Sequence, residues 1–183
     1  MKRLMFSSLS ILLFSAAMLP SVKAESVASS QKNPIADRHT QILIAQNQPA
    51  MLMAGDSDGT PTGFTKEQWM TAQGTVSVSP VKNNNYKLTL KAKGLVPNGI
   101  YTLWWANKKV IGMDLGPVGG AANNKFKANG QGNGTATITV PANNNYQMLV
   151  IAYHADNKTY GNMPGEMGKI TFTHLAGDFP KSN

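Results

Sequence analysis

Alternating apolar and polar positions dominate the second half of the chain, and residues 86–93 show the pattern most clearly. Leu88, Leu90 and Ala92 fall on one side of this stretch, while three lysines and Thr89 fall on the other. Successive side chains of a β-strand point to opposite faces, so the alternation indicates a strand with one buried and one solvated face. Strands of this kind are typical of antiparallel sheets.

Further strand signals follow at short intervals along the chain. Residues 134–140 alternate again, whereas residues 146–153 are apolar on both faces, which is typical of a central strand. The remaining runs are rich in β-branched or aromatic residues and lie at 76–78, 100–105, 109–113 and 169–175. Clusters of Gly, Asn and Pro separate these runs, and asparagine tolerates the left-handed backbone of sharp turns. Seven or eight strands with such spacing predict an all-β, antiparallel β-sandwich over residues 74–180.

A short helix is expected immediately before the sandwich, over residues 65–73. Thr65 and Gln68 have the spacing of a capping box, in which each side chain bonds a free backbone amide of the other residue. Residues 25–64, by contrast, are rich in polar residues and proline, and their two apolar islands show no sustained period. We expect residues 25–64 to form a disordered leader or linker.

The amino-terminal residues 1–24 have the three parts of a secretory signal. Lys2 and Arg3 precede an apolar run from Leu4 to about Leu19, and small residues lead up to Ala24. The apolar run is short and interrupted by serines, which argues against a membrane span of about 20 residues. We expect cleavage after Ala24, a secreted or periplasmic mature protein, and no transmembrane segment after cleavage.

Charge and cysteine content narrow the range of partners. The chain has 17 basic and 9 acidic residues, and cleavage after residue 24 lowers its net charge from +8 to +5. Arg38 would then be the only arginine, and specific nucleic-acid readers rely on arginine, so we expect no nucleic-acid partner. Dispersed lysines fit a mild affinity for an anionic envelope component or polysaccharide. The absence of cysteine excludes disulfides, thiolate metal sites and a cysteine nucleophile.

Catalytic motifs give no positive signal. The sequence contains no GxSxG elbow, no HExxH zinc motif and no phosphate-binding glycine loop. Four carboxylates in the predicted domain have spacings that bring no two of them together by sequence alone. We therefore expect a role other than catalysis.

A copper site is the sharpest chemical hypothesis. His154 ends the predicted central strand, Met163 and Met167 lie in the following glycine-rich loop, and His174 lies in the next strand. Imidazole and thioether ligands suit Cu(I), so these four residues are the candidate metal ligands and copper the candidate cofactor. The alternative is that the methionines fill gaps and the histidines bond loop carbonyls, in which case we expect no cofactor.

Aromatic residues offer a second kind of site. Trp104 and Trp105 are adjacent in a predicted strand, so one should enter the core and the other should lie near the surface. An exposed tryptophan near Tyr160, surrounded by asparagine and lysine, would suit the stacking of sugar rings. These three residues are the candidate glycan-binding residues, unless the amino-terminal segment covers them.

Two resemblances accompany this reading. The stretches GLVPNGIYTLWW and FKANGQGNGTATITV are similar to the turn regions of copper-zinc superoxide dismutase and chordin-domain sandwiches, which implies an immunoglobulin-like or superoxide-dismutase-like fold. Tyr101, Trp104 and Trp105 stand where the dismutase pattern has metal histidines, so the resemblance implies neither the ligands nor the activity. The YTLWW and YHADNKTYGNMPGEMG stretches also resemble uncharacterised exported bacterial proteins of cyanobacterial type.

The sequence as a whole predicts an exported, non-enzymatic binding or structural module of the cell envelope or extracellular space. Copper binding through the histidine and methionine residues is one alternative, and glycan binding through an aromatic face is the other. A glycan or another envelope component is the expected partner.

Overall fold

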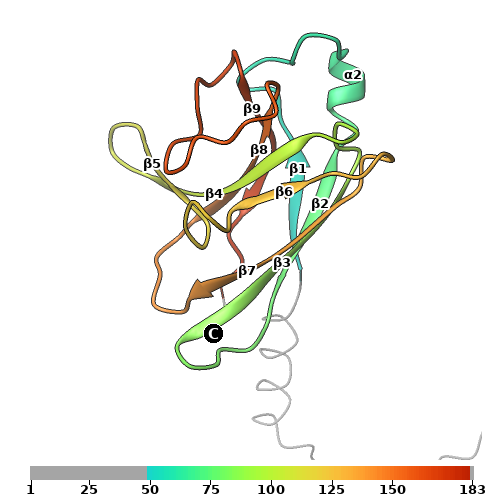
Figure 1. Cartoon of the computed structure of the whole chain (residues 1–183). Coiled ribbons are helices and arrows are strands. Elements are labelled where there is room, and N and C mark those ends of the chain that lie inside the picture. Colours follow the sequence, from blue (N-terminus) through green and yellow to red (C-terminus); the bar gives the residue numbers. More distant parts are fainter. Residues whose placement is uncertain (1–48, 182–183) are drawn as a thin grey trace, which may run out of the picture. The chain divides into compact units, whose positions relative to one another are not determined.

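The computed structural model describes residues 49–181, which form an antiparallel β-sheet with one short helix (Figure 1). The predicted signal peptide, and the leader as far as residue 48, lie outside the described residues. The elements are β1 Ala50–Ala54, α2 Lys66–Trp69, β2 Gln73–Val78, β3 Asn85–Lys93, β4 Ile100–Lys108, β5 Met113–Pro117, β6 Lys125–Lys127, β7 Gly134–Pro141, β8 Met148–His154 and β9 Thr171–Asp178.

The strand order across the sheet is β5-β4-β8-β9-β1-β2-β3-β7, with β6 paired to β4 beside β5. Every pairing between these strands is antiparallel. The sheet curls so that its two halves enclose one cluster of buried apolar side chains, which come from α2, from the loops and from every strand except β5 and β6. The prediction of an all-β, antiparallel, sandwich-like fold is confirmed.

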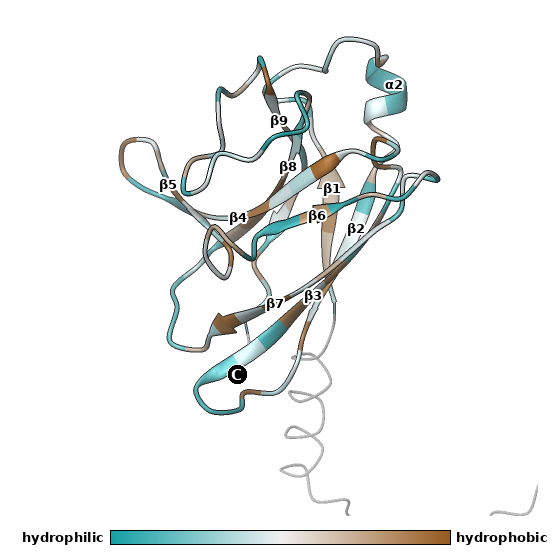
Figure 2. Cartoon of the chain, in the orientation of Figure 1, coloured by the Kyte–Doolittle hydropathy of each residue, from teal (hydrophilic) through white to brown (hydrophobic). Residues whose placement is uncertain are grey.

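The alternation in β3 produces the inner and outer faces as predicted. Leu88 and Leu90 are completely buried, and Leu88 is paired with Ile138 of β7 on the same inner face. Lys87 and Lys91 lie on the outer face and are exposed. Figure 2 shows the resulting change between hydrophobic and hydrophilic segments along β3. Burying the apolar face is worth about 1.5–3 kcal/mol for each large side chain, which fixes the register of this strand.

The expected disorder of residues 25–64 is wrong for residues 50–54. This segment is β1, which lies between β9 and β2 in the middle of the sheet and buries Leu52 completely. Met51 and Met53 lie on the outer face and are exposed. Because methionine is apolar, its presence at outward positions hides the alternation that would otherwise mark a strand.

The strand predicted at 109–113 begins later, at Met113. The Lys109 amide donates to the Gly112 carbonyl at 3.2 Å and closes a turn, so β5 runs from Met113 to Pro117. Gly112 has a φ of +74°, a backbone conformation that glycine adopts at little cost. The asparagine-rich turn before β3 behaves as predicted, with Asn83 and Asn84 at φ values of +51° and +58°.

The helix α2 carries the predicted capping box. The Thr65 hydroxyl accepts from the Gln68 amide at 3.2 Å, and the Gln68 side chain accepts from the Thr65 amide at 3.0 Å. The helix is a single turn, and it buries Trp69 against the inner side of the sheet. Within residues 49–181, no helix is both long and apolar enough to cross a membrane.

Candidate functional site

His154 is a completely buried residue on the outer side of the β4–β8–β9 sheet. Its Nε2 lies 2.7 Å from the Thr102 hydroxyl, which also accepts from the Trp104 indole N–H at 2.7 Å. Its Nδ1 lies 3.3 Å from the Thr171 hydroxyl, which donates to the Pro164 carbonyl at 2.7 Å. The ring therefore joins three strands to the loop between β8 and β9.

The donor and the acceptor in each of these hydrogen bonds follow from the groups at the two ends of the network, the Trp104 indole N–H and the Pro164 carbonyl. The Pro164 carbonyl can only accept, so the Thr171 proton goes to it and the Thr171 oxygen accepts from His154 Nδ1–H. A neutral ring then has no proton on Nε2, which accepts the Thr102 proton. Burial lowers the pKa of His154, which favours this neutral form. Both ring nitrogens are thus occupied by structural hydrogen bonds.

His174 forms a separate network on the inner side of the sheet and is 1% exposed. Its Nε2–H donates to the Trp69 carbonyl at 3.0 Å, and its Nδ1 accepts from the Tyr101 hydroxyl at 2.9 Å. The Tyr101 oxygen in turn accepts from the Val96 amide at 2.8 Å. The Trp69 indole stacks on the imidazole, with the ring centres 3.5 Å apart. Burial lowers the pKa of His174 to about 4, so the ring is neutral at pH 7.

The structure does not assemble the predicted copper ligands into one set. His154 and His174 lie on opposite faces of the sheet, and each has hydrogen-bond partners at both nitrogens. Met163 and Met167 are exposed on the loop that follows β8. Among the described residues, no group of three or more histidine and acidic side chains is placed to hold a metal ion. The alternative interpretation of the histidines, as hydrogen-bonded structural residues, fits the geometry better.

The predicted aromatic residues do not form a continuous exposed face either. Trp104 is 2% exposed, so its ring is not accessible for stacking on a sugar. Trp105 is half-buried and stacks on Tyr146, with the ring centres 4.7 Å apart. Tyr160 is exposed, and its hydroxyl donates to the Asp156 carboxylate. Trp105 is therefore the tryptophan nearer the surface, and it is already paired.

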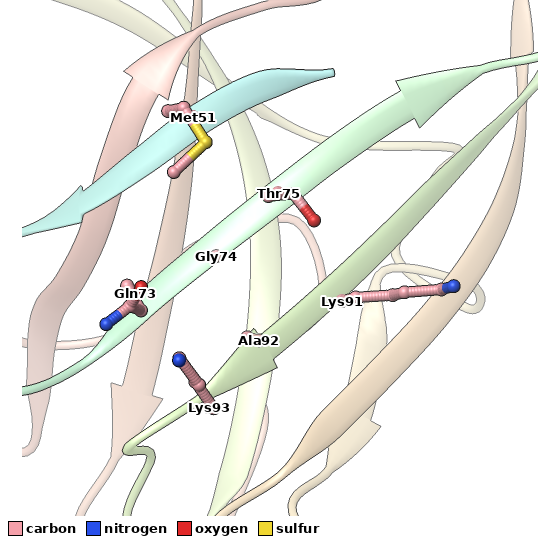
Figure 3. Close-up of a pocket in the computed structure, with 7 residues that line it drawn as sticks. All are labelled: Met51, Gln73, Gly74, Thr75, Lys91, Ala92 and Lys93. Atoms are coloured by element: carbon pink, nitrogen blue, oxygen red, sulfur yellow. The ribbon is translucent and has the colours of Figure 1, made fainter.

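A different surface collects polar chemistry on the outer face of β1, β2 and β3. We call it the lysine face, and it consists of Met51, Gln73, Thr75, Lys87, Thr89, Lys91 and Lys93. The register pairs Thr75 with Lys91 and Gln73 with Lys93, so amide, hydroxyl and lysine side chains leave the same face of the two strands. A pocket lies here, lined by residues of β1, β2 and β3. Figure 3 shows the Lys93 side chain directed toward Gln73, Met51 across β2, and the Lys91 side chain directed away from Gln73.

The charges of the lysine face are not neutralised locally. Within residues 49–181, the ion pairs are Lys66–Asp56, Lys109–Asp114 and Lys169–Glu166, and none involves Lys87, Lys91 or Lys93. Two strand residues that are two positions apart lie about 7 Å from each other on one face. Lys91 and Lys93 therefore bring two free ammonium groups to the face that carries Gln73 and Thr75, which suits an extended, anionic, hydroxyl-rich ligand.

The lysine face follows in part from a pattern that is visible in the sequence, although that pattern alone indicates no function. The alternation over residues 86–93 placed the lysines outward, and a solvated strand face was its simplest interpretation. The sequence does not show that β2 lies next to β3, where Gln73 and Thr75 complete the pocket. Two lysines without acidic neighbours, on a strand close to amide and hydroxyl residues, are the signal that could have identified the lysine face.

A scan against protein-family models and a search of curated proteins both find no match. The resemblances to superoxide-dismutase-like sandwiches and to exported bacterial proteins stay predictions.

Proposed function

We propose that this protein is an exported, non-enzymatic binding module of the cell envelope or extracellular space, and that its lysine face binds an anionic glycan. The observation that carries the proposal is the pair of unneutralised lysines, Lys91 and Lys93, on the same strand face as Gln73 and Thr75. Carboxylate or sulfate groups would bind the ammonium groups, and sugar hydroxyls would bond the amide and hydroxyl. The exposed Met51 supplies an apolar wall for the face of a ring.

The strength expected of such a site favours a polymer over a small molecule. An exposed ion pair contributes about 0.2–1 kcal/mol, so two lysines and two hydrogen-bonding groups hold one sugar unit only weakly. A repeating anionic chain would engage the lysine face many times, which raises the effective concentration of each later contact. An envelope or extracellular polysaccharide provides that repetition.

The other parts of the proposal rest on separate observations. Export is supported by the signal-like pattern of residues 1–24. A non-enzymatic role is supported by His154 and His174, since both rings are enclosed and fully bonded within the fold. A general base needs access to the proton that it abstracts, and neither ring has it.

The proposal can be tested with two matched double variants. Lys91→Gln/Lys93→Gln removes the charges of the lysine face, and Lys125→Gln/Lys127→Gln removes an equally spaced, exposed lysine pair from β6. Binding of dextran sulfate and of neutral dextran is measured by calorimetry at about 0.15 M salt, where distant charges are screened. We expect binding of dextran sulfate alone, weakened about tenfold by the first variant and far less by the second.

Two outcomes would overturn the proposal. Equal losses in both variants would show that binding follows net charge alone and not the lysine face. No binding of dextran sulfate by the unmodified protein would remove the anionic glycan as the ligand class. Both variants change exposed side chains on strand surfaces, so their folding is expected to be unaffected.

A further inference from the structure

The turn between β4 and β5 carries the two most exposed apolar side chains among the described residues. Val110 is 104% exposed and Ile111 is 91% exposed, so neither side chain packs on the rest of the fold. Figure 1 shows this hairpin projecting from the sheet, and Figure 2 shows hydrophobic colour near its end. We call residues 108–113 the hairpin tip. Two β-branched apolar side chains at a projecting turn expose surface that would be removed from water on binding.

The backbone of the hairpin tip is already hydrogen-bonded up to its last turn. β4 and β5 pair as far as Lys108 with Met113, and the Lys109 amide donates to the Gly112 carbonyl at 3.2 Å. The paired backbone below the apex therefore keeps its hydrogen bonds if the apolar side chains of the apex enter an apolar medium. Shallow insertion therefore buries the side chains of the apex and leaves its remaining backbone groups near the polar headgroups.

The apolar surface continues from the apex onto β5. Met113 and Leu115 are exposed on the outer face of this strand, two positions apart. We call Val110, Ile111, Met113 and Leu115 the apolar strip. These residues follow one hairpin and its edge strand.

The charged side chain near the apolar strip that has no ion-pair partner within residues 49–181 is a lysine. Lys108 and Lys109 precede the apolar pair, and Asp114 is the only acidic residue between Trp105 and Ala122. Asp114 lies 3.4 Å from the Lys109 ammonium, which neutralises it. Lys108 has no ion pair within residues 49–181. Long lysine side chains can place their stems along an apolar surface while their charged ends stay in water.

We propose that the hairpin tip inserts shallowly into the headgroup region of an anionic lipid bilayer. Val110 and Ile111 would enter the boundary between headgroups and acyl chains, and Lys108 would meet the lipid phosphates. Apolar burial and attraction to anionic lipid act together in such binding. This inference is independent of the glycan proposal, because it rests on different residues at a different end of the fold.

A bilayer fits the hairpin tip better than a folded partner or a second copy does. A stable protein interface buries about 800 Å² on each partner, usually over a broad complementary patch. Four side chains along one projecting hairpin form a small protruding surface and not a broad patch of that kind. A fluid lipid surface closes around a small protruding surface without a matching groove, and its negative charge complements the unpaired lysine.

The test is flotation of the protein with vesicles of two compositions. One is an equimolar mixture of phosphatidylglycerol and phosphatidylcholine, and the other is phosphatidylcholine alone. We expect flotation with the mixed vesicles, reduced about tenfold or more in Val110→Thr/Ile111→Thr. This variant keeps the charge and the β-branched shape of both residues and changes only exposed atoms, so it should fold normally. Met163→Thr/Met167→Thr, which removes two exposed apolar side chains from another loop, is expected to float like the unmodified protein.

Three results would contradict the inference. One is undiminished flotation of the Val110→Thr/Ile111→Thr variant, which would show that lysines elsewhere hold the vesicles. Another is failure of the unmodified protein to float with either vesicle. The third is a dimer in sedimentation equilibrium that this variant dissociates, which would make a second copy the occupant. Dextran sulfate binding should be the same in this variant, so failure here leaves the glycan proposal standing.

Discussion

Acidification is expected to weaken the fold through His174 well before the carboxylates are protonated. The pKa of this histidine falls from 6.5 in an unfolded chain to about 4 in the fold, because burial disfavours its charged form. Between these two values the unfolded chain binds a proton that the folded protein does not bind. The free energy of unfolding contributed by His174 is therefore complete above pH 6.5 and is lost as the pH falls toward 4.

The size of the loss follows from the same two pKa values. Each pH unit in the interval costs up to 1.36 kcal/mol, so the fold loses about 2 kcal/mol between pH 7.5 and pH 5. The loss reaches about 3 kcal/mol at pH 4. The lowered pKa of His154 adds a loss of the same sign. For a domain with a total stability of about 5–15 kcal/mol, this is a large fraction.

Urea denaturation at a series of pH values from 7.5 to 4 measures this loss directly. Trp69 stacks on the His174 ring and is buried, so its fluorescence follows unfolding of the relevant part of the core. The variant His174→Gln removes the titrating ring, and its stability should depend on pH only through His154 and the carboxylates in this range. A pH dependence that is equal in the unmodified protein and the variant would refute the assignment of a neutral, buried His174.

Three further substitutions test the packing and the hydrogen-bond networks, each by urea denaturation. Thr102→Val leaves the Trp104 indole N–H and His154 Nε2 without their shared partner, and it should lower the free energy of unfolding by about 3 kcal/mol; a loss below 1 kcal/mol would contradict the network. Leu52→Ala should cost about 2–5 kcal/mol, because this side chain anchors β1 in the core, and an unchanged stability would show that β1 is not docked. Gly177→Ala would place a Cβ 2.3 Å from a β1 carbonyl oxygen, so it should destabilise the fold by about 1–3 kcal/mol, whereas tolerance of the methyl group would contradict the close approach.

The elements that the sequence predicted well are those whose signal is local. The alternation of β3 and the capping box of Thr65 and Gln68 depend on neighbouring residues, and both appear as predicted. β1 was missed because Met51 and Met53 are apolar at outward positions, and because its partners β9 and β2 are distant or later in the chain. A five-residue strand in the middle of a sheet is specified by those partners more than by its own pattern.

The candidate site residues also depend on partners that are distant in the sequence. The sequence places His154 and His174 near strand ends, but it cannot tell which face of the sheet each one occupies. A β-bulge between β8 and β9, next to Ile151 and Ala152, changes the alternation of β9 and brings both His174 and Leu175 inward. His154 and His174 are buried hydrogen-bond centres because of Thr102 and Tyr101, which are far from them in the sequence. Chemistry that depends on such pairings becomes visible only in the folded chain.

Mapping a sulfated polysaccharide onto the protein by nuclear magnetic resonance tests the central claim most directly. Backbone amide shifts are recorded while dextran sulfate of short, defined length is added, with neutral dextran as the control. We expect the largest changes in β2 and β3, around Gln73, Thr75, Lys91 and Lys93. Changes centred on Tyr160 and the loop after β8, or none within this face, would contradict the claim that the lysine face is the binding surface.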